Sequence, residues 1–404
     1  MAVGSNFGGI TFPRTSDALV LHLVVGLDLI CFDVNRGDYS LREIHRLRLA
    51  APVQYVWPHP SRSLLYVVSS NRSLSAADDQ HALATVGIDE RTGVMRLLSE
   101  VPLPTRPIHV TLDASAQYAL VAYNAPALVT THRIDAEGCA GESVTQRSEP
   151  RSGHFPHQVL MLPSGKAAVI VARGNHATLG RAEEPGSLEF LSLHHGQLSN
   201  VVTVVPDGGT GFGPRHLSFH PLGRWAAVSV ERHNELHVFA VEHDRFAPKP
   251  VWRMSTLQSP AAGGRDQLSS TVRFHPSGRF LYVVNRHDTS VYSDGSVPSD
   301  LSGNNIAVYA FDESDGRPVL LQHVPTESIH VRTFSLDSSG SLLVTASILP
   351  ALAQCPGGVK RVPARLTFFR VAEDGCLTRV KVLDMDNERL SMFWSHLNGN
   401  AQIA

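Results

Sequence analysis

The feature that most constrains this chain is a strand–turn–strand segment that recurs at intervals of 49 to 62 residues. The recurring segments are "HPSRSLLYVV" from His59, "DASAQYALVA" from Asp113, "LPSGKAAVIV" from Leu162, "HPLGRWAAVS" from His220, "HPSGRFLYVV" from His275 and "DSSGSLLVTA" from Asp337. A period near 50 residues made of strands and tight turns is typical of a β-propeller. One small sheet cannot bury both of its faces, so neighbouring units must stack.

Each repeat contains four strand-like runs. In the repeat that contains His275 they are residues 271–275, 280–285, 305–312 and 318–324, which are rich in Val, Leu, Tyr and Phe. Gly, Pro, Asp and Ser separate the runs, as tight turns require. Helical patterns of ten or more residues are missing, so the sequence predicts an all-β fold with four antiparallel strands per blade.

Six complete repeats leave the two ends of the chain to be placed. Residues 18–50 supply three outer strands of one more blade, and "RLSMFWSHLN" at 389–398 resembles its missing inner strand. Closing the ring with both ends removes exposed sheet edges. We therefore expect residues 1–404 to form one seven-bladed propeller domain, since no Pro/Gly/Ser-rich linker interrupts the period.

Composition excludes several classes of protein. The net charge of −2 gives no bias toward nucleic acid or a membrane surface, and 43% apolar residues fit a packed globular chain. Cys31, Cys139, Cys355 and Cys376 are far apart and predict neither a disulfide framework nor a metal site. Without a signal peptide or an 18-residue apolar run, a soluble cytoplasmic protein is expected, as a monomer or homodimer.

Long insertions fall on one face of the predicted ring. The tight turns within each repeat share one face, whereas the insertions at 70–81, 173–186, 286–305 and 347–365 connect the second and third strands on the other. Length variation confined to one face is typical of a binding face.

Two columns of the aligned repeats open onto this face near the axis. The first residues of the inner strands are Gln54, Ile108, His157, Arg215, Ser270 and Arg332. The last residues of the second strands are Ser70, Asn124, Arg173, Glu231, Arg286 and Ile348. Structural positions should repeat, but these differ from blade to blade, as in a site built once per molecule. Arginines around one axis repel unless an anion offsets them, so we predict an anionic ligand.

Some polar residues have a simpler interpretation. His59, His220 and His275 belong to the repeated turn and are expected to be structural. His109 and His216 come one place after the first column, so strand alternation would point them to the other side of the strand. For these two residues, packing between blades and contact with substrate are both compatible with the sequence. Arg173 is equally compatible with a structural ion pair and with a place in the site.

The motifs resemble those of a known family, the seven-bladed propeller lactonases that include the bacterial 6-phosphogluconolactonase and the fungal 3-carboxymuconate lactonising enzyme. The resemblance covers nearly the whole chain and depends on "GPRHLSFHP" at 213–221, "FHPSGRFLYVVNR" at 274–286, "VRTFSLDSSG" at 331–340 and "FPHQV" at 155–159. It implies the same fold and an active site on the face that carries the long loops.

The resemblance also implies roles for particular residues. His157, Arg215, Glu231, Arg286 and Arg332 match the family's site histidine, glutamate and arginines. Three positions depart from the family pattern: "HFPH" replaces His-x-His and puts His154 out of register, and Val230 and Val331 replace an asparagine and a proline. The strand asparagine is kept at Asn285.

We therefore predict a lactonase that opens an anionic sugar or organic-acid lactone without a metal or other cofactor. His157 is expected to carry the proton, since a histidine can do so at neutral pH. Glu231 orients it or pairs with the arginines, and Arg215 and Arg286 hold the anionic group and polarise the carbonyl. Substrate contacts are expected from Arg332, His216, His109, Arg173 and Asn285.

Two other functions remain compatible with the sequence. The same residues would serve an intramolecular cyclase that closes a muconate-type carboxylate into a lactone. Propellers also bind protein partners without catalysis, although the Ser-, Asp-, Gly- and His-rich loops favour a small-molecule site. The sequence leaves open an axial magnesium or calcium ion.

Overall fold

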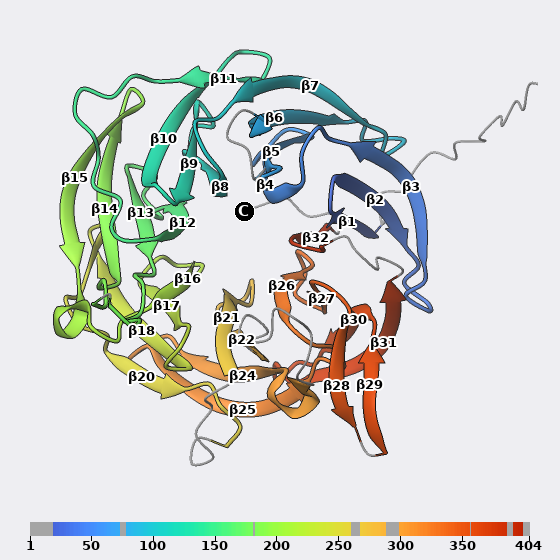
Figure 1. The fold of residues 1–404 in the computed structure, drawn as a ribbon. Coiled ribbons are helices and arrows are strands. Elements are labelled where there is room, and N and C mark those ends of the chain that lie inside the picture. The colour runs from blue at the N-terminus through green and yellow to red at the C-terminus, as the bar shows by residue number, and fades with distance from the viewer. Residues whose placement is uncertain are drawn as a thin grey trace, which may run out of the picture.

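The computed structural model describes residues 19–72, 78–180, 182–259, 267–287, 299–355, 357–385 and 391–398. Seven antiparallel sheets of four or five strands stand in a ring around a central axis (Figure 1), which confirms the predicted seven-bladed propeller. The two helices among these residues are short 3-10 turns, Pro206–Gly209 and Leu301–Gly303.

The blades are numbered here along the chain, and each is given from the axis outward. Blade 1 is β32 (Ser395–Asn398), β1 (Leu19–Val25), β2 (Asp28–Val34) and β3 (Leu41–Arg48). Blade 2 is β4 (Val53–Pro58), β5 (Leu64–Ser70), β6 (His81–Ile88) and β7 (Met95–Pro102). Blade 3 is β8 (Pro107–Leu112), β9 (Tyr118–Asn124), β10 (Ala127–Ile134) and β11 (Ala140–Ser143). Blade 4 is β12 (Pro156–Met161), β13 (Ala167–Ala172), β14 (Ser187–His194) and β15 (Gln197–Val204).

The remaining three blades follow the same plan. Blade 5 is β16 (Pro214–Phe219), β17 (Trp225–Val230), β18 (Glu235–Glu242) and an outer strand split into β19 (Arg245–Phe246) and β20 (Trp252–Ser255). Blade 6 is β21 (Gln267–Phe274), β22 (Phe280–His287), β24 (Asn305–Asp312) and β25 (Arg317–Pro325). Blade 7 is β26 (Val331–Leu336), β27 (Leu342–Ser347), β30 (Ala364–Val371) and β31 (Leu377–Met385).

Blade 1 closes the ring with strands from both ends of the chain. β32 pairs antiparallel with β1, and His396 lies opposite His22 in that register. Trp394, just before β32, is 3% exposed and packs with blades 1 and 2. The closure predicted from residues 18–50 and 389–398 is confirmed for the residues that the structure describes.

The hydrophobic cores lie between neighbouring blades. Val24 of blade 1 shares a cluster with Val67 of blade 2, and Leu236 of blade 5 shares one with Tyr309 of blade 6. Because every sheet buries its two faces against its neighbours, the inner strands are held rigidly at the axis. This rigidity positions the side chains that line the axis.

A β-bulge interrupts the start of the inner strand in blades 2 to 7. The pairing of inner and second strand skips one residue in five blades and two residues in blade 6. The skipped residues are Gln54, Ile108, His157, Arg215, Ser270 with Thr271, and Arg332. These include every member of the first column found in the sequence. A bulge re-aims the side chain that it carries, so the column is set apart structurally.

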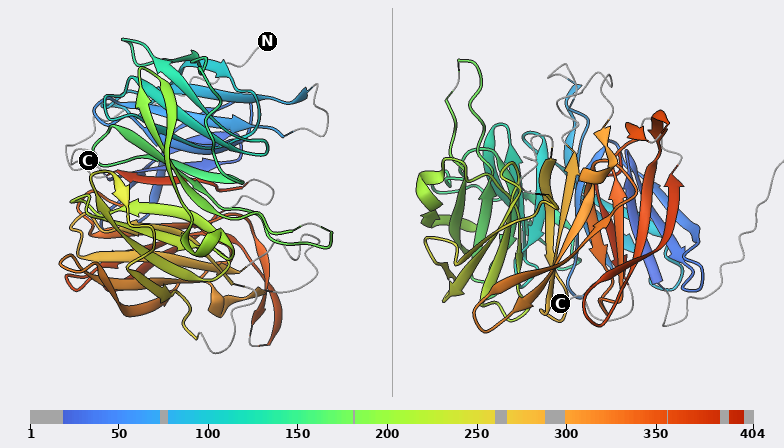
Figure 2. Two further views of the ribbon diagram at one scale, coloured as in Figure 1. Left: turned by 90° about the vertical axis from the view of Figure 1, so that its left-hand side faces the viewer. Right: turned by 90° about the horizontal axis from the view of Figure 1, so that it is seen from below.

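The insertions project from one face, the face where the inner strands begin. The connection from β13 to β14 and a hairpin in blade 7 rise from it together (Figure 2). That hairpin, β28 (Ala351–Cys355) and β29 (Gly358–Val362), pairs with β23 (Ser299–Asp300). The sequence predicted plain loops here; the turn at Gly357, with φ of 94°, instead allows a hairpin. No helix in the described ranges is long and apolar enough to cross a membrane.

Candidate active site

Glu231, which follows β17 directly, is the centre of the charged cluster. Its carboxylate contacts three arginines from three blades: Arg286 Nη2 and Arg215 Nε lie 2.7 and 3.0 Å from Oε1, and Arg173 Nη1 lies 3.0 Å from Oε2. Glu231 is 2% exposed and its backbone N–H donates to Gly213 O. The predicted contact between Arg215 and Glu231 is therefore present, and Arg286 joins it.

The arginines determine the charge state of Glu231. Burial by itself would raise the pKa of this carboxyl, but Arg286, Arg215 and Arg173 hold it far below its ordinary range. A carboxylate with so low a pKa, whose two oxygens are both occupied by guanidinium groups, is a poor proton acceptor. The geometry therefore suits Glu231 to positioning the arginines.

His157 lies at the bulge of β12, beside this cluster. It is 7% exposed, and its Nδ1 is buried with no hydrogen-bond partner among the described residues. Burial, followed by the charges of Arg215 and Arg332, holds the pKa of His157 well below 6.5. The imidazole is neutral at pH 7 and has a free ring nitrogen.

A cavity of about 400 Å³ follows the axis between the inner strands. Its described lining includes four arginines, Arg106, Arg215, Arg273 and Arg332, and three histidines, His109, His157 and His216. No Asp or Glu is among the lining residues that the structure describes. Of the four, only Arg215 contacts a carboxylate within this part of the chain, whereas Arg332 lies over the Phe393 ring at 5.6 Å. The cavity is strongly positive.

His109 and His216 line the same cavity as His157 and Arg215, so the expectation that they point to the other side of the strand is wrong. The bulge is the reason, because it inserts an extra residue and breaks the strict alternation on which that expectation depended. His216 Nδ1 lies 3.1 Å from Thr271 Oγ1 and its ring is 5.1 Å from that of His157. His109 and His216 therefore both contact a neighbouring blade and line the cavity.

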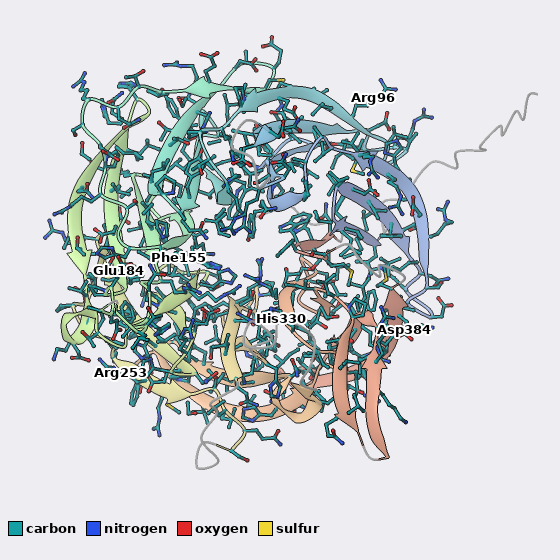
Figure 3. All side chains as sticks on the ribbon, in the orientation of Figure 1. Arg96, Phe155, Glu184, Arg253, His330 and Asp384 are labelled. Carbon is teal, nitrogen blue, oxygen red and sulfur yellow. The ribbon has the colours of Figure 1, made fainter. Side chains whose placement is uncertain are left out.

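Two other predicted residues lie outside the cavity lining. Arg173 lies 4.3 Å over the ring of Phe155 and reaches Glu231 from the loop face; Figure 3 labels Phe155 at the inner side of the ring. The Asn285 amide, fully buried, donates to Thr256 O at 2.5 Å and to Asn305 Oδ1 at 3.0 Å. Asn285 thus connects strands within blade 6 and its neighbourhood and is not placed to contact a ligand in the cavity.

Sequence reasoning missed several residues of the site. His330, labelled near the axis in Figure 3, accepts a hydrogen bond at Nε2 from Arg286 Nη1 at 3.1 Å. Arg106 donates twice to Gln54 Oε1, at 2.9 and 2.7 Å, and Arg273 comes from β21. Neither arginine stands in the two aligned columns, but a search of every inner strand for charged residues would have found Arg273.

No group of three or more His, Cys, Asp or Glu side chains in the described ranges is arranged to hold a metal ion. Glu231, the carboxylate that contacts the cavity residue Arg215, has its oxygens occupied by arginines.

Comparisons with known proteins agree with this geometry. A family model described as "Lactonase, 7-bladed beta-propeller" matches residues 26–348. A 6-phosphogluconolactonase of Pectobacterium atrosepticum is 27% identical over 64% of this chain and 69% of its own length, and one of Bacillus subtilis is 26% identical over 77% and 82%. Among solved structures, a Lactobacillus plantarum protein has a TM-score of 0.69 at 19% identity, covering 94% of this chain and 99% of its own. The Pseudomonas aeruginosa periplasmic gluconolactonase has a TM-score of 0.69 at 18% identity, covering 93% and 99%. At these identities the two structures show the fold alone.

Proposed function

Because this chain belongs to the seven-bladed β-propeller lactonase family, we propose that it hydrolyses the cyclic ester of an anionic lactone bound in its axial cavity. One observation carries the proposal: four arginines and His157 line the cavity, and the described lining contains no carboxylate. Such a cavity is unfavourable when empty and favourable when it holds an anion. Its volume of about 400 Å³ suits a small organic acid or sugar acid.

His157 is the general base in this proposal. The neutral imidazole takes a proton from a water molecule as the water oxygen attacks the lactone carbonyl carbon. The electron pair of the C=O bond moves to its oxygen and gives a tetrahedral oxyanion. When the oxyanion collapses, the ring C–O bond breaks and the protonated His157 returns its proton to the departing alkoxide. Hydrolysis thus needs only water and one proton carrier.

The arginines stabilise the negative charge that develops. Arg215 and Arg332 line the cavity and can donate to the oxyanion or to the substrate's anionic group. Arg286 and Arg173 act through Glu231, which they share with Arg215. This differs from the role expected for Arg286, because its guanidinium is occupied by Glu231 and His330.

An anionic substrate also makes His157 a stronger base. The positive charges of Arg215 and Arg332 help to lower its pKa in the empty cavity. A bound anion offsets those charges and raises the pKa of His157 toward neutrality, where a general base works best. Substrate charge and catalysis are therefore coupled.

The names of the relatives suggest which lactone to test first. Those of Pectobacterium atrosepticum and Bacillus subtilis are named 6-phosphogluconolactonase. We therefore place a phosphorylated sugar lactone ahead of an aromatic-catabolism lactone. Metal independence and a cytoplasmic location, both expected from the sequence, are part of the same proposal.

The test is a lactone screen by proton release at fixed pH. It includes 6-phosphoglucono-δ-lactone, glucono-δ-lactone and muconolactone, with 3-carboxymuconate as the cyclase substrate. His157→Ala should lower kcat by about 10²–10⁴-fold, the usual contribution of a general base, with an unchanged melting temperature. His154→Ala is the matched control, because His154 is 55% exposed and lies outside the described cavity lining.

Two results would contradict the proposal. Near-normal turnover by His157→Ala would remove this residue from the mechanism. Ring closure of 3-carboxymuconate, without opening of any lactone, would make the protein a cyclase. Addition of a chelator tests metal independence in the same assay and should leave the rate unchanged.

A further inference from the structure

A second cluster of polar groups lies in the axial cavity, away from Glu231. Arg273 on β21 and Tyr55 on β4 both line the cavity, and the charge of Arg273 acts on the Tyr55 hydroxyl. The ring of Tyr55 is 4.0 Å from that of His109 on β8. All three side chains line the cavity, although they come from blades 6, 2 and 3. The cluster therefore spans the axis.

Several atoms of this cluster are buried without a partner. Both ring nitrogens of His109, which is 1% exposed, lack a hydrogen bond to any described residue. The same holds for Nε of Arg273 and for Nε2 of the neighbouring His396. Leaving a buried polar atom unsatisfied costs roughly 1–3 kcal/mol. Three of these atoms, on His109 and Arg273, belong to residues that line the cavity, where a bound group could satisfy them.

Arg273 lies at a different level of the axis from the Glu231 cluster, whereas Tyr55 and His109 directly follow the first-column residues of their strands. On β21, Ser270 accepts from Arg215 at 3.1 Å, which fixes the level of the upper cluster. Arg273 comes at the other end of β21. It is two residues after Thr271, and thus about 7 Å further than Thr271 toward the tight-turn face. The charge of Arg273 acts on Tyr55, His109 and His396, and the charge of Arg215 also reaches Tyr55, so the two clusters adjoin each other. Only the Glu231 cluster contains a carboxylate among the described residues.

We propose that Arg273, with Tyr55 and His109, forms a second anion subsite that binds a phosphate or carboxylate at the end of the substrate remote from the lactone carbonyl. The inference rests on the proposed function, and it deepens it by defining the substrate as a lactone with a separate anionic group. Arg273 and Tyr55 then determine specificity rather than take part in the bond-breaking step.

The donors in the cluster fit such an anion. Arg273 offers a guanidinium that no described carboxylate contacts, and guanidinium groups bind phosphate and carboxylate in bidentate fashion. The Tyr55 hydroxyl lines the cavity and can donate its O–H to an anion. Burial lowers the pKa of His109 to about 3, so this imidazole is neutral and offers one N–H. A neutral ligand would leave the Arg273 charge unbalanced.

The experiment compares kcat/KM for 6-phosphoglucono-δ-lactone with that for glucono-δ-lactone, which lacks the phosphate. We expect Arg273→Ala to reduce this ratio by about 10–100-fold, mainly through KM, as the loss of a charged hydrogen-bonding group predicts. Arg273→Lys should restore part of the ratio, and Tyr55→Phe should reduce it about 3–10-fold. Arg279→Ala, an exposed arginine of the same blade, is the matched control and should leave the ratio unchanged.

Measuring muconolactone as a further substrate distinguishes a phosphate-binding subsite from a carboxylate-binding one. If the subsite takes a carboxylate, Arg273→Ala lowers kcat/KM for muconolactone and leaves the phosphate ratio alone; if it takes a phosphate, the reverse holds. If Arg273→Ala changes neither the phosphate ratio nor kcat/KM for muconolactone, the subsite is overturned. If Arg273→Ala does not fold, Tyr55→Phe decides by the same criterion.

Calorimetry provides a test that does not need turnover. Wild-type protein should bind 6-phosphogluconate more tightly than gluconate, and Arg273→Ala should lose this difference. If no lactone is hydrolysed but the difference depends on Arg273, the proposed function fails and the subsite stands. If lactones are hydrolysed, the difference is absent or survives in Arg273→Ala, and muconolactone turnover is also unchanged in that variant, the subsite fails and the proposed function stands.

Discussion

The two ends of the inner strands carry the same residue types and use them differently. At the tight-turn end, His220 Nδ1 accepts from Leu222 N at 3.2 Å, and His275 Nε2 lies 3.0 Å from Gly340 O of the next blade. At the cavity end, His109 and His157 have buried ring nitrogens without a partner in the described chain. The turn histidines are satisfied by their own fold, whereas the cavity histidines are not.

This difference separates structural from functional histidines better than burial does. His220 is 3% exposed and His157 is 7% exposed, so both are buried. The turn end is repeated: Asp337 accepts from Leu342 N as His220 accepts at its own turn. At the cavity end, by contrast, the polar residues differ from blade to blade. A residue whose partners recur in each repeat stabilises the fold, whereas a cavity residue whose partners are missing is available to a ligand.

Glu231→Gln tests the cavity end with the largest expected effect. Removal of this carboxylate leaves three guanidinium groups at a buried position without their counter-charge, so the free energy of unfolding should fall by about 3–5 kcal/mol. Urea denaturation measures it. Glu189→Gln is the control, because Glu189 is 5% exposed but is held by the Ser187 and Thr203 hydroxyls. That variant should lose about 1–2 kcal/mol, and equal losses would show that the arginines do not depend on Glu231.

His109→Phe should change how stability depends on pH. Burial, followed by the charge of Arg273, lowers the folded-state pKa of His109 to about 3, while the unfolded value is 6.5. Between these values only the unfolded chain binds the proton, so wild-type stability falls as pH falls from 6.5 toward 3. The variant lacks this loss, which amounts to about 2 kcal/mol between pH 6.5 and 5.

Unfolding curves at several pH values measure this effect. The difference between His109→Phe and wild type should grow by about 1.4 kcal/mol per pH unit below 6.5. His154→Asn, which removes a half-exposed imidazole, serves as the comparison variant. Parallel curves for wild type and His109→Phe would mean that His109 is protonated in the folded state.

His220→Asp should have the smallest effect and should spare the cavity. Asp113 and Asp337 already occupy this turn position in other blades and accept from backbone N–H groups. We expect a loss of about 1 kcal/mol in stability from the missing ring contacts, with kcat/KM unchanged. A large loss of activity in this variant would contradict the division between the two ends.

The motifs predicted the family and the closure of the ring correctly, because both depend on local pattern. The repeat gave the number of blades, and the pairing of Arg215 with Glu231 followed from counting along two antiparallel strands. The assignment of His220 to a structural turn depended on repetition alone. These inferences needed only the period of the chain and the alternation of strand direction.

The sequence by itself determined which residues stand near the axis, since strand period and turn position are written locally. The tertiary structure decided which of them share a cavity. Bulges in six blades directed His109 and His216 inward against the alternation rule, and the ring brought Arg273, Tyr55 and His109 together from three blades. Bulge geometry and contacts across the axis depend on how neighbouring blades pack, and no local pattern along one strand encodes that packing.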